Sequence, residues 1–264
     1  ILLTNTGNNF SGTVAFTGAN VGLAAASSLA LAGSSASGNL GLTSTGSVTQ
    51  TGALSVAGTS ELNSSGNLTL DHVANDFGGA VTYNGLAVSL ADRNDLLIQV
   101  GISSENSTLV AQGDITENDY LSIGGWTFLT AGADINLGTS NTFVGRVKFT
   151  GDNVNIRNTV NQLALGTSTA LGDLNLSAPS LLSVGSLTAV GAATLALEGP
   201  MVAGALQAGA LAITGATTVN QTAAWTVAGP TSITGTGAVV VDNPANDFGD
   251  TYIQGTVIVL ADAN

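Results

Sequence analysis

The sequence predicts an all-β fold in which short strands wind into a solenoid, a parallel β-helix. Three observations predict it. One pentamer recurs along the chain, apolar residues alternate with small polar residues after each copy, and only 8% of the residues are charged. Ser, Thr, Asn and Gly carry the polar load instead, and these residues suit turns and strands but are poor formers of long helices.

The pentamer begins with Asn and has Phe two residues later. Its closest copies stand at 75–79 and 246–250, and weaker copies stand at 8–12 and 141–145. Because the Asn residues share one repeat position, we expect them to form a buried ladder of side-chain amides at a turn, with the Phe rings in the core. The repeat positions are Asn8, Phe10, Asn75, Phe77, Asn141, Phe143, Asn246 and Phe248.

The spacing of the pentamer predicts the length of one coil. Successive Phe residues are separated by offsets of 77 − 10 = 67, 143 − 77 = 66 and 248 − 143 = 105 in the sequence. These offsets are close to three, three and five units of about 21 to 22 residues, which is a typical solenoid repeat. The chain 1–264 is therefore expected to be a single β-helix segment of roughly twelve coils, cut from a longer repeat protein.

The composition excludes several functions. Asp and Glu number 17 against 4 Lys and Arg, which gives a formal net charge of -13. Nucleic-acid binding needs a basic surface and is not expected. No apolar run is long enough for a spanning helix, and without cysteine there is neither a disulfide framework nor a thiolate metal site. We expect no cofactor and no metal.

Residues 101–123 fit the repeat least well and form the most acidic stretch of the chain. We expect an irregular coil or a protruding loop there, and loops on a rigid scaffold are common binding sites. The stretch lacks the spacing of an EF-hand. The candidate ligand-binding residues are Glu105, Asp114, Glu117, Asp119 and Trp126.

Three runs of sequence resemble a known family. They are SVTQTGALSVAGTSELNSSGNLTL at 47–70, NDFGGAVTYNGLAVSLAD at 75–92, and the NDFG and GTVIVLADAN segments within 246–264. They resemble the repeat regions of filamentous-haemagglutinin-like exoproteins and related bacterial autotransporter adhesins. The resemblance covers most of the chain, least so 101–135. It implies a right-handed β-helix, export from a Gram-negative bacterium, and a role in adhesion, biofilm formation or presentation of a toxic tip.

The residues that could support catalysis have simpler interpretations. His72 is the only histidine, and the matching positions elsewhere are Asn5 and Asn243, which are typical turn residues. Polysaccharide-active β-helix enzymes need clustered carboxylates. The nearest cluster contains Asp71, Asp76, Asp92 and Asp95, and we interpret these as turn-forming residues, because Asp76 and Asp92 recur as Asp247 and Asp262.

Two further patterns concern the surface. Trp225 aligns with Leu54 and is expected to point inward, whereas Trp126 follows two glycines and could be exposed for stacking on a sugar. Outward threonines such as Thr49 and Thr169 suggest an ice-binding face, but they do not recur at the expected unit of about 21 to 22 residues. The sequence therefore argues against ice binding.

The function expected from these patterns is structural and adhesive rather than enzymatic. A stiff rod would hold binding elements away from a bacterial outer cell surface, and its partners would be host glycans, matrix proteins or neighbouring bacterial cells. The main alternative is a self-assembling extracellular filament subunit, since open coil edges can pair end to end. A polysaccharide-active enzyme is the third hypothesis.

Overall fold

The computed structural model describes residues 1–183 and 185–263, and every regular element within them is a β-strand. The fold is an all-β parallel β-solenoid of about 14 turns with about 19 residues per turn. The chain divides into two compact units, Ile1–Asp134 (unit 1) and Ile135–Asn264 (unit 2). The right-handed coiling stays a prediction from the resemblance.

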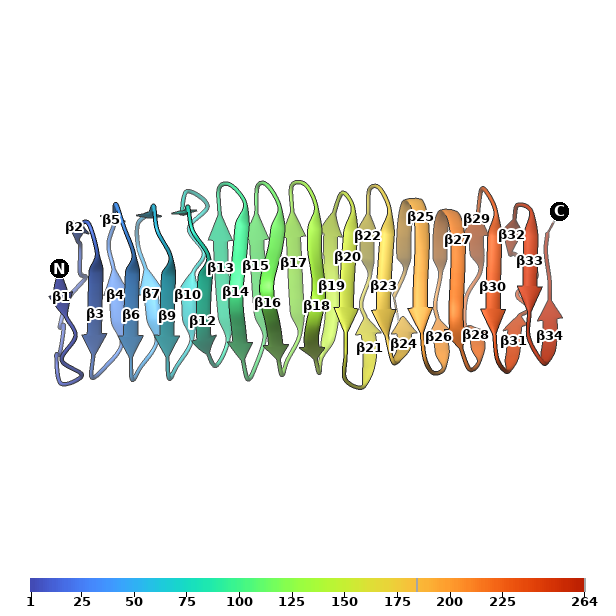
Figure 1. Cartoon of the computed structure of the whole chain (residues 1–264), viewed down its shortest axis with the longest axis horizontal. Coiled ribbons are helices and arrows are strands. Elements are labelled where there is room, and N and C mark those ends of the chain that lie inside the picture. Colours follow the sequence, from blue (N-terminus) through green and yellow to red (C-terminus); the bar gives the residue numbers. More distant parts are fainter. Residues whose placement is uncertain (184, 264) are drawn as a thin grey trace. The chain divides into compact units, whose positions relative to one another are not determined.

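Unit 1 has three faces, each made of parallel strands from successive coils (Figure 1). The first strand of face 1A pairs with β1 (Leu2–Leu3). Face 1A contains β3 (Val21–Ala25), β6 (Leu40–Ser44), β9 (Ser60–Ser64), β12 (Val81–Gly85), β14 (Leu96–Ser103) and β16 (Ile115–Ile123). Face 1B contains β4 (Leu29–Leu31), β7 (Val48–Gln50), β10 (Leu68–Leu70), β13 (Val88–Asp92), β15 (Ser107–Ala111) and β17 (Thr127–Ala131). Face 1C contains β2 (Thr17–Gly18), β5 (Ser34–Ala36), β8 (Leu54–Val56) and β11 (Asp76–Phe77).

Unit 2 is built in the same way, except that some of its strands contribute to two faces, among them two strands of eleven residues. It begins with β18 (Ile135–Phe143), which pairs with the first strand of face 2A, and β19 (Arg146–Gly151), which pairs with faces 2B and 2C. Face 2A contains β20 (Val154–Asn158), β23 (Leu174–Ala178), β30 (Thr231–Gly235) and β33 (Thr251–Gln254), and face 2C contains β22 (Ser168–Ala170), β29 (Trp225–Val227) and β32 (Asp247–Phe248). Face 2B contains β21 (Gln162–Leu165), β24 (Ser180–Ser183), β26 (Met201–Ala203), β28 (Val219–Gln221), β31 (Ala238–Val241) and β34 (Val257–Leu260). The long strands β25 (Leu187–Leu197) and β27 (Leu206–Ala216) each run from face 2C into face 2A.

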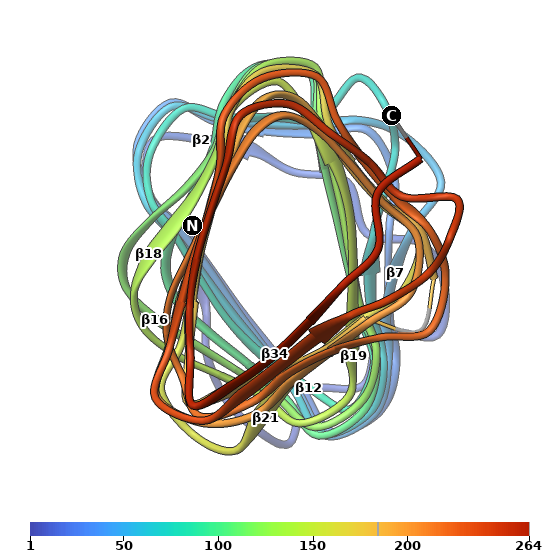
Figure 2. The ribbon, with the colours of Figure 1, turned by 90° about the vertical axis from the view of Figure 1, so that its right-hand side faces the viewer.

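Alternation of apolar and small polar residues explains these strands. Leu23, Leu42 and Leu62 stack in register on face 1A and are at most 1% exposed, while the neighbours of Leu42 and Leu62 in the strands are half-buried or exposed. Viewed end-on, the coils of each unit follow one another around a shared interior (Figure 2). Such short strands bury too little apolar surface alone, so each coil is stable only against its neighbours.

The coil is shorter than the pentamer spacing predicted, because the sequence repeat and the coil are out of step. Val21, Leu40, Ser60 and Val81 stack in one column, so three coils correspond to a sequence offset of 81 − 21 = 60. The offset between the first two pentamers, 77 − 10 = 67, is larger than this by about one further face. Division of that offset by three therefore overestimated the coil.

The positions of the pentamers show this rotation directly. In unit 1, the backbone oxygen of Asn8 accepts the N–H of Ala26, which lies at the corner between faces 1A and 1B, whereas Asn75 lies at the next corner, between β10 and β11. In unit 2, the backbone oxygen of Asn141 accepts the N–H of Thr159, which lies at the corner between faces 2A and 2B. Asn246 lies at the next corner, between faces 2B and 2C. Within each unit, the second pentamer thus stands one face further around the coil than the first.

The expected loop at 101–123 does not protrude. The segment lies in β14, β15 and β16, which pair in register with the coils beside them. Its irregularity is a register shift opposite Ile98 and Val100. The composition was misleading because outward strand positions tolerate acidic residues as well as a loop does, while Ile115, Leu121 and Ile123 keep the inward positions buried.

Polar side chains close the corners between faces. Each accepts the backbone N–H of the residue at the same corner one coil later: Asn39 N–H donates to Asn20 Oδ1 at 2.9 Å, and Thr59 N–H donates to Asn39 Oδ1 at 3.0 Å. A second ladder of the same kind, at the corner before face 1B, links Ser28, Ser47 and Asn67. Corner N–H groups that strand pairing would leave out are thereby satisfied.

Candidate functional site

A dense polar network holds the corner at Asn75. The Asn75 side chain is fully buried. Its Oδ1 accepts the Leu54 N–H at 2.9 Å and Gln50 Nε2 at 2.8 Å, and its Nδ2 donates to Gln50 Oε1 and to the Leu70 oxygen, both at 2.9 Å. We call the reciprocal amide pair the Gln–Asn clamp. It ties two successive coils together and satisfies the whole Asn amide.

The corner at Asn246 repeats the clamp. Asn246 Oδ1 accepts Gln221 Nε2 at 2.8 Å and the Trp225 N–H at 2.9 Å, and Asn246 Nδ2 donates to Gln221 Oε1 at 2.8 Å and to the Val241 oxygen at 2.9 Å. The sequence offset between the two glutamines, 221 − 50 = 171, equals the offset between the two asparagines, 246 − 75 = 171. Sequence comparison aligns Gln50 with Gln221 but does not reveal that they hold the Asn residues.

The four pentamer asparagines do not form an amide ladder. Asn75 and Asn246 pair with glutamines, the buried Asn141 donates to the Leu137 oxygen at 3.0 Å, and the half-buried Asn8 donates to the Leu3 oxygen at 2.9 Å. A ladder needs one Asn in each successive coil, whereas the two pentamers within each unit are several coils apart and at different corners.

The Phe of three of the four pentamers is held by the next coil. Phe77, Phe143 and Phe248 are 3%, 0% and 3% exposed, whereas Phe10 is half-buried. The backbone N–H groups of the three buried residues donate to a carboxylate or amide oxygen 14 or 15 residues later. These acceptors are Asp92 Oδ2 at 3.2 Å, Asn158 Oδ1 at 3.0 Å and Asp262 Oδ1 at 3.3 Å.

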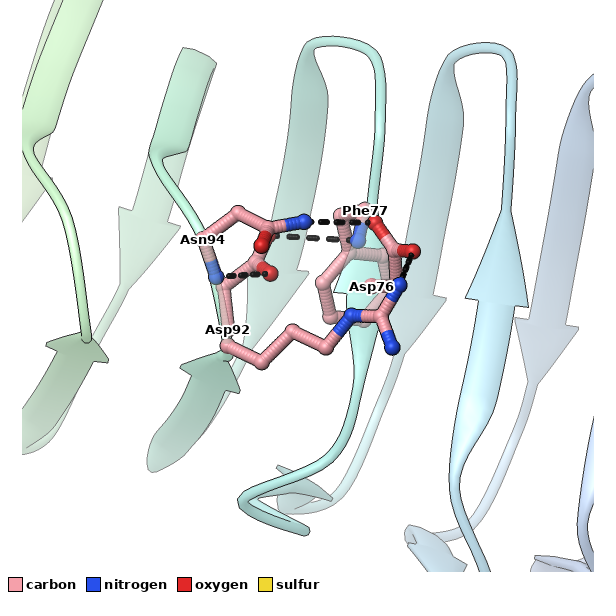
Figure 3. Close-up of polar contacts among 5 residues, drawn as sticks. Asp76, Phe77, Asp92 and Asn94 are labelled. Atoms are coloured by element: carbon pink, nitrogen blue, oxygen red, sulfur yellow. Dashed lines mark hydrogen bonds and ion pairs between the residues drawn. The ribbon is translucent and has the colours of Figure 1, made fainter.

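The carboxylate cluster near Asp92 serves the corner (Figure 3). Asp92 is 2% exposed and also accepts the Asn94 N–H at 3.1 Å, while Asp76 accepts Asn94 Nδ2 at 3.0 Å and pairs with Arg93. Burial raises the pKa of Asp92 to about 6, against the lowering effect of its backbone hydrogen bonds. The remaining members, Asp71 and Asp95, bond to Ser89 and to the Asp114 N–H.

His72 occupies a turn position. Its Nδ1 accepts the Ala74 N–H at 3.1 Å and its backbone oxygen accepts the Asn75 N–H at 2.9 Å. Asn243 makes the same two bonds, with Ala245 at 3.0 Å and Asn246 at 3.0 Å. The histidine therefore replaces an Asx-turn residue. Across residues 1–183 and 185–263, no group of three or more His, Asp or Glu side chains could hold a metal ion.

The acidic candidates of the expected loop are not brought together. Exposed Glu105 lies at the corner before β15, Asp114 lies at the corner before β16, and Glu117 and Asp119 lie within β16. Asp114 belongs to a corner ladder, because its Oδ1 accepts the Asp134 N–H at 2.9 Å.

Trp126 is an exposed aromatic candidate. It is 40% exposed and stacks on half-buried Phe128, with ring centroids 5.7 Å apart and planes at 16°. Trp225, by contrast, is fully buried, as its alignment with Leu54 predicted, and its Nε1 donates to the Gly204 oxygen at 2.9 Å. Sequence reasoning did not single out Phe128, although its spacing of two residues from Trp126 could have indicated that both rings lie on the same side of the chain.

Thr49 and Thr169 do recur once the coil length is known. Thr69, Ser89 and Thr108 stack in the column of Thr49, and Thr188 stacks on Thr169. The expected absence of recurrence resulted from the overestimated coil. The next outward column along face 1B mixes residue types, with Asp71, Ala91 and Val110, so the face lacks the paired Thr columns of an ice-binding surface.

A family model for repeats of unknown function (DUF5649) matches residues 18–84, 85–150, 151–202 and 196–253. The chain belongs to this family. The first two DUF5649 matches begin at an offset of 85 − 18 = 67, the same as that of the first two pentamers, so the family repeat also exceeds three coils. No curated protein and no solved structure matches the chain. Among the described residues, no helix has the length and apolarity that a membrane crossing needs.

Proposed function

We propose that the chain is a structural and adhesive segment of a secreted bacterial surface protein of the filamentous-haemagglutinin-like type. It would act as a stiff scaffold that presents attachment surfaces to host cells, neighbouring cells or biofilm matrix at the outer cell surface. The supporting observation is that the buried polar side chains best suited to chemistry, including Asn75, Asp92 and Asn246, bond to the backbone of adjacent coils.

The corners and faces support a mechanical role. Corner ladders and the two clamps link each coil to the next, so that an applied load is shared by many backbone hydrogen bonds rather than by one contact. Outward positions carry mainly Ser, Thr, Asn and Gly, which leave flat faces open to a partner.

The test is retention of beads coated with the purified chain on epithelial cells, on matrix proteins and on bacterial lawns under flow. We expect retention on at least one surface at several times the level of albumin-coated beads. Retention equal to albumin on every surface contradicts the adhesive role and leaves a spacer role.

A filament subunit is the second candidate, and an apolar outward column on face 2B favours it. Leu182, Val202 and Val240 are half-buried in this column, with Asn220 between the last two. Contact between such columns on two copies would bury apolar area. A filament subunit is expected to form concentration-dependent fibres in light scattering and electron microscopy, and V202N is expected to abolish them. A chain that stays monodisperse at high concentration contradicts the filament function.

A further inference from the structure

We propose that Trp126 and Phe128 form a platform that binds a neutral glycan on the outer side of face 1B. The inference rests on the adhesive function proposed above and names its ligand class. It starts from two outward columns that run across successive coils of unit 1 and include this aromatic pair.

The first column consists of three hydroxyl side chains followed by a Phe ring. Thr69, Ser89, Thr108 and Phe128 follow one another in the register of β10, β13, β15 and β17. Adjacent parallel strands are about 4.8 Å apart, so the hydroxyls form an evenly spaced row that leads to the Phe128 ring. An extended sugar chain carries its hydroxyls at comparable regular intervals and can exchange hydrogen bonds with such a row.

The second column is the corner ladder beside it. The Trp126 N–H donates to Asn106 Oδ1 at 2.8 Å, and the Trp126 oxygen accepts the Ser107 N–H at 2.8 Å. A Cβ at Gly124 would lie 2.4 Å from the Ser104 oxygen, and one at Gly125 would lie 2.5 Å from Asn106 Oδ1. Only glycines allow this close approach, and they fix the backbone that presents the indole.

The aromatic pair has the geometry of a stacking surface. Phe128 stacks on one face of the indole and supports it, while 40% of Trp126 remains open to solvent and can receive a ligand. The C–H face of a pyranose packs on an aromatic face, while its edge hydroxyls remain available to polar neighbours. Thr108 in the hydroxyl column and Asn106 at the corner are those neighbours.

The charge of unit 1 selects among glycans. Residues 1–134 contain ten Asp and Glu residues and one Arg, a formal charge of 1 − 10 = −9. Exposed Glu105 lies next to Asn106, close to the platform. Sulfated or carboxylated polysaccharides would be repelled, so the geometry and the charge together favour a neutral chain.

Tryptophan fluorescence of the whole chain tests the proposal directly, because Trp225 is buried and Trp126 is the exposed indole. The probes are neutral hexasaccharides of glucose, mannose, galactose and N-acetylglucosamine, with dextran sulfate and polylysine as charged probes. We expect a saturable emission change with at least one neutral hexasaccharide. Calorimetry on the variants should show binding weakened at least tenfold by W126A and about threefold by F128T, with W126F keeping most of it.

Y252A is the matched control, since it removes an exposed ring in unit 2 and is expected to leave the affinity unchanged. Circular dichroism and thermal unfolding verify that each variant is folded. Absence of binding to every neutral hexasaccharide overturns the proposal, as does binding that W126A leaves intact, or binding to dextran sulfate or polylysine alone. Bead retention that persists while neutral glycans fail overturns the ligand class but not the adhesive function.

Discussion

The corners at Asn75 in unit 1 and Asn246 in unit 2 share the Gln–Asn clamp but differ around it. The reciprocal amide bonds are 2.8 and 2.9 Å long in the first corner and both 2.8 Å in the second. Outside the clamp, His72 replaces Asn243 in the turn, and buried Asp92 corresponds to exposed Asp262. The difference teaches that the buried amides fix the corner, while the turn residue and the burial of the carboxylate that accepts the Phe N–H can vary.

Removal of the clamp asparagine should have the largest effect. N75A leaves the Leu54 N–H and the Gln50 amide without their partner in a buried corner, and each unpaired group costs about 1 to 3 kcal/mol. We expect about 4 kcal/mol of lost stability from N75A, and the same from N246A, measured by denaturant unfolding. N8A is the control, because the half-buried Asn8 donates to backbone oxygens instead of a Gln; a loss equal to that of N75A would contradict the account.

The second prediction concerns the residue whose N–H the clamp accepts, which is Leu54 in one corner and Trp225 in the other. W225L makes the corners alike but removes an indole from a filled interior and leaves the Gly204 oxygen without its donor. We expect a loss of about 3 kcal/mol from the cavity and the lost bond. If W225L unfolds at the same denaturant concentration as the parent chain, the interior of unit 2 is not packed as described.

The third prediction separates Asp92 from Asp262 by pH. The pKa of folded Asp92 is about 6, above the ordinary value of 3.8, so the folded state binds the proton more tightly than the unfolded state. The stabilisation of the folded state by this preferential protonation of Asp92 is fully present below about pH 4 and is lost as the pH rises through about 6. D92N mimics the protonated acid, so it should match the parent chain near pH 4 and exceed it by about 2 kcal/mol at pH 7.

The control for Asp92 is D262N at the exposed counterpart, which should leave the pH dependence of the parent chain in place. Parallel stability curves for D92N and the parent chain between pH 4 and 7 would show that Asp92 is not a buried carboxylate.

The smallest effect is expected at the turn. H72N gives the turn of unit 1 the residue found in the turn of unit 2. The Oδ1 of the introduced Asn can accept the Ala74 N–H, as Asn243 Oδ1 accepts the Ala245 N–H. We expect a change within about 0.5 kcal/mol, typical of exposed positions. A loss several times larger would mean that the imidazole makes a contribution beyond the turn.

The sequence was sufficient for the fold class but not for the coil. Alternation at Leu40, Leu42, Leu54 and Val56 directly predicts short strands with a buried side, and the pentamer predicts a solenoid. The coil length could not be derived from the pentamer offset, because a single sequence does not reveal that the second pentamer of each unit stands one face further around the coil than the first. Only the stacking register supplies that rotation.

The site was predictable in part for a similar reason. Turn roles for His72 and Asp76 follow from their alignment with Asn and Asp, and the exposure of Trp126 follows from the glycines before it. The clamp joins Gln50 to a residue 25 positions later, and the polar rows join residues one coil apart. Such pairs lie outside any local pattern and need the correct coil length.

The most direct test of the account measures distances between spin labels, since the chain has no cysteine to remove. Labels at T49C and T108C lie in one column three coils apart, about 14 Å along the stack at about 4.8 Å per layer. Labels at T49C and T116C have the sequence offset of the pentamer, 116 − 49 = 67, and should lie on different faces. The account predicts a clearly shorter distance for the first pair, whereas a shorter distance for the second pair would show that the repeat is in register with the coil and would contradict it.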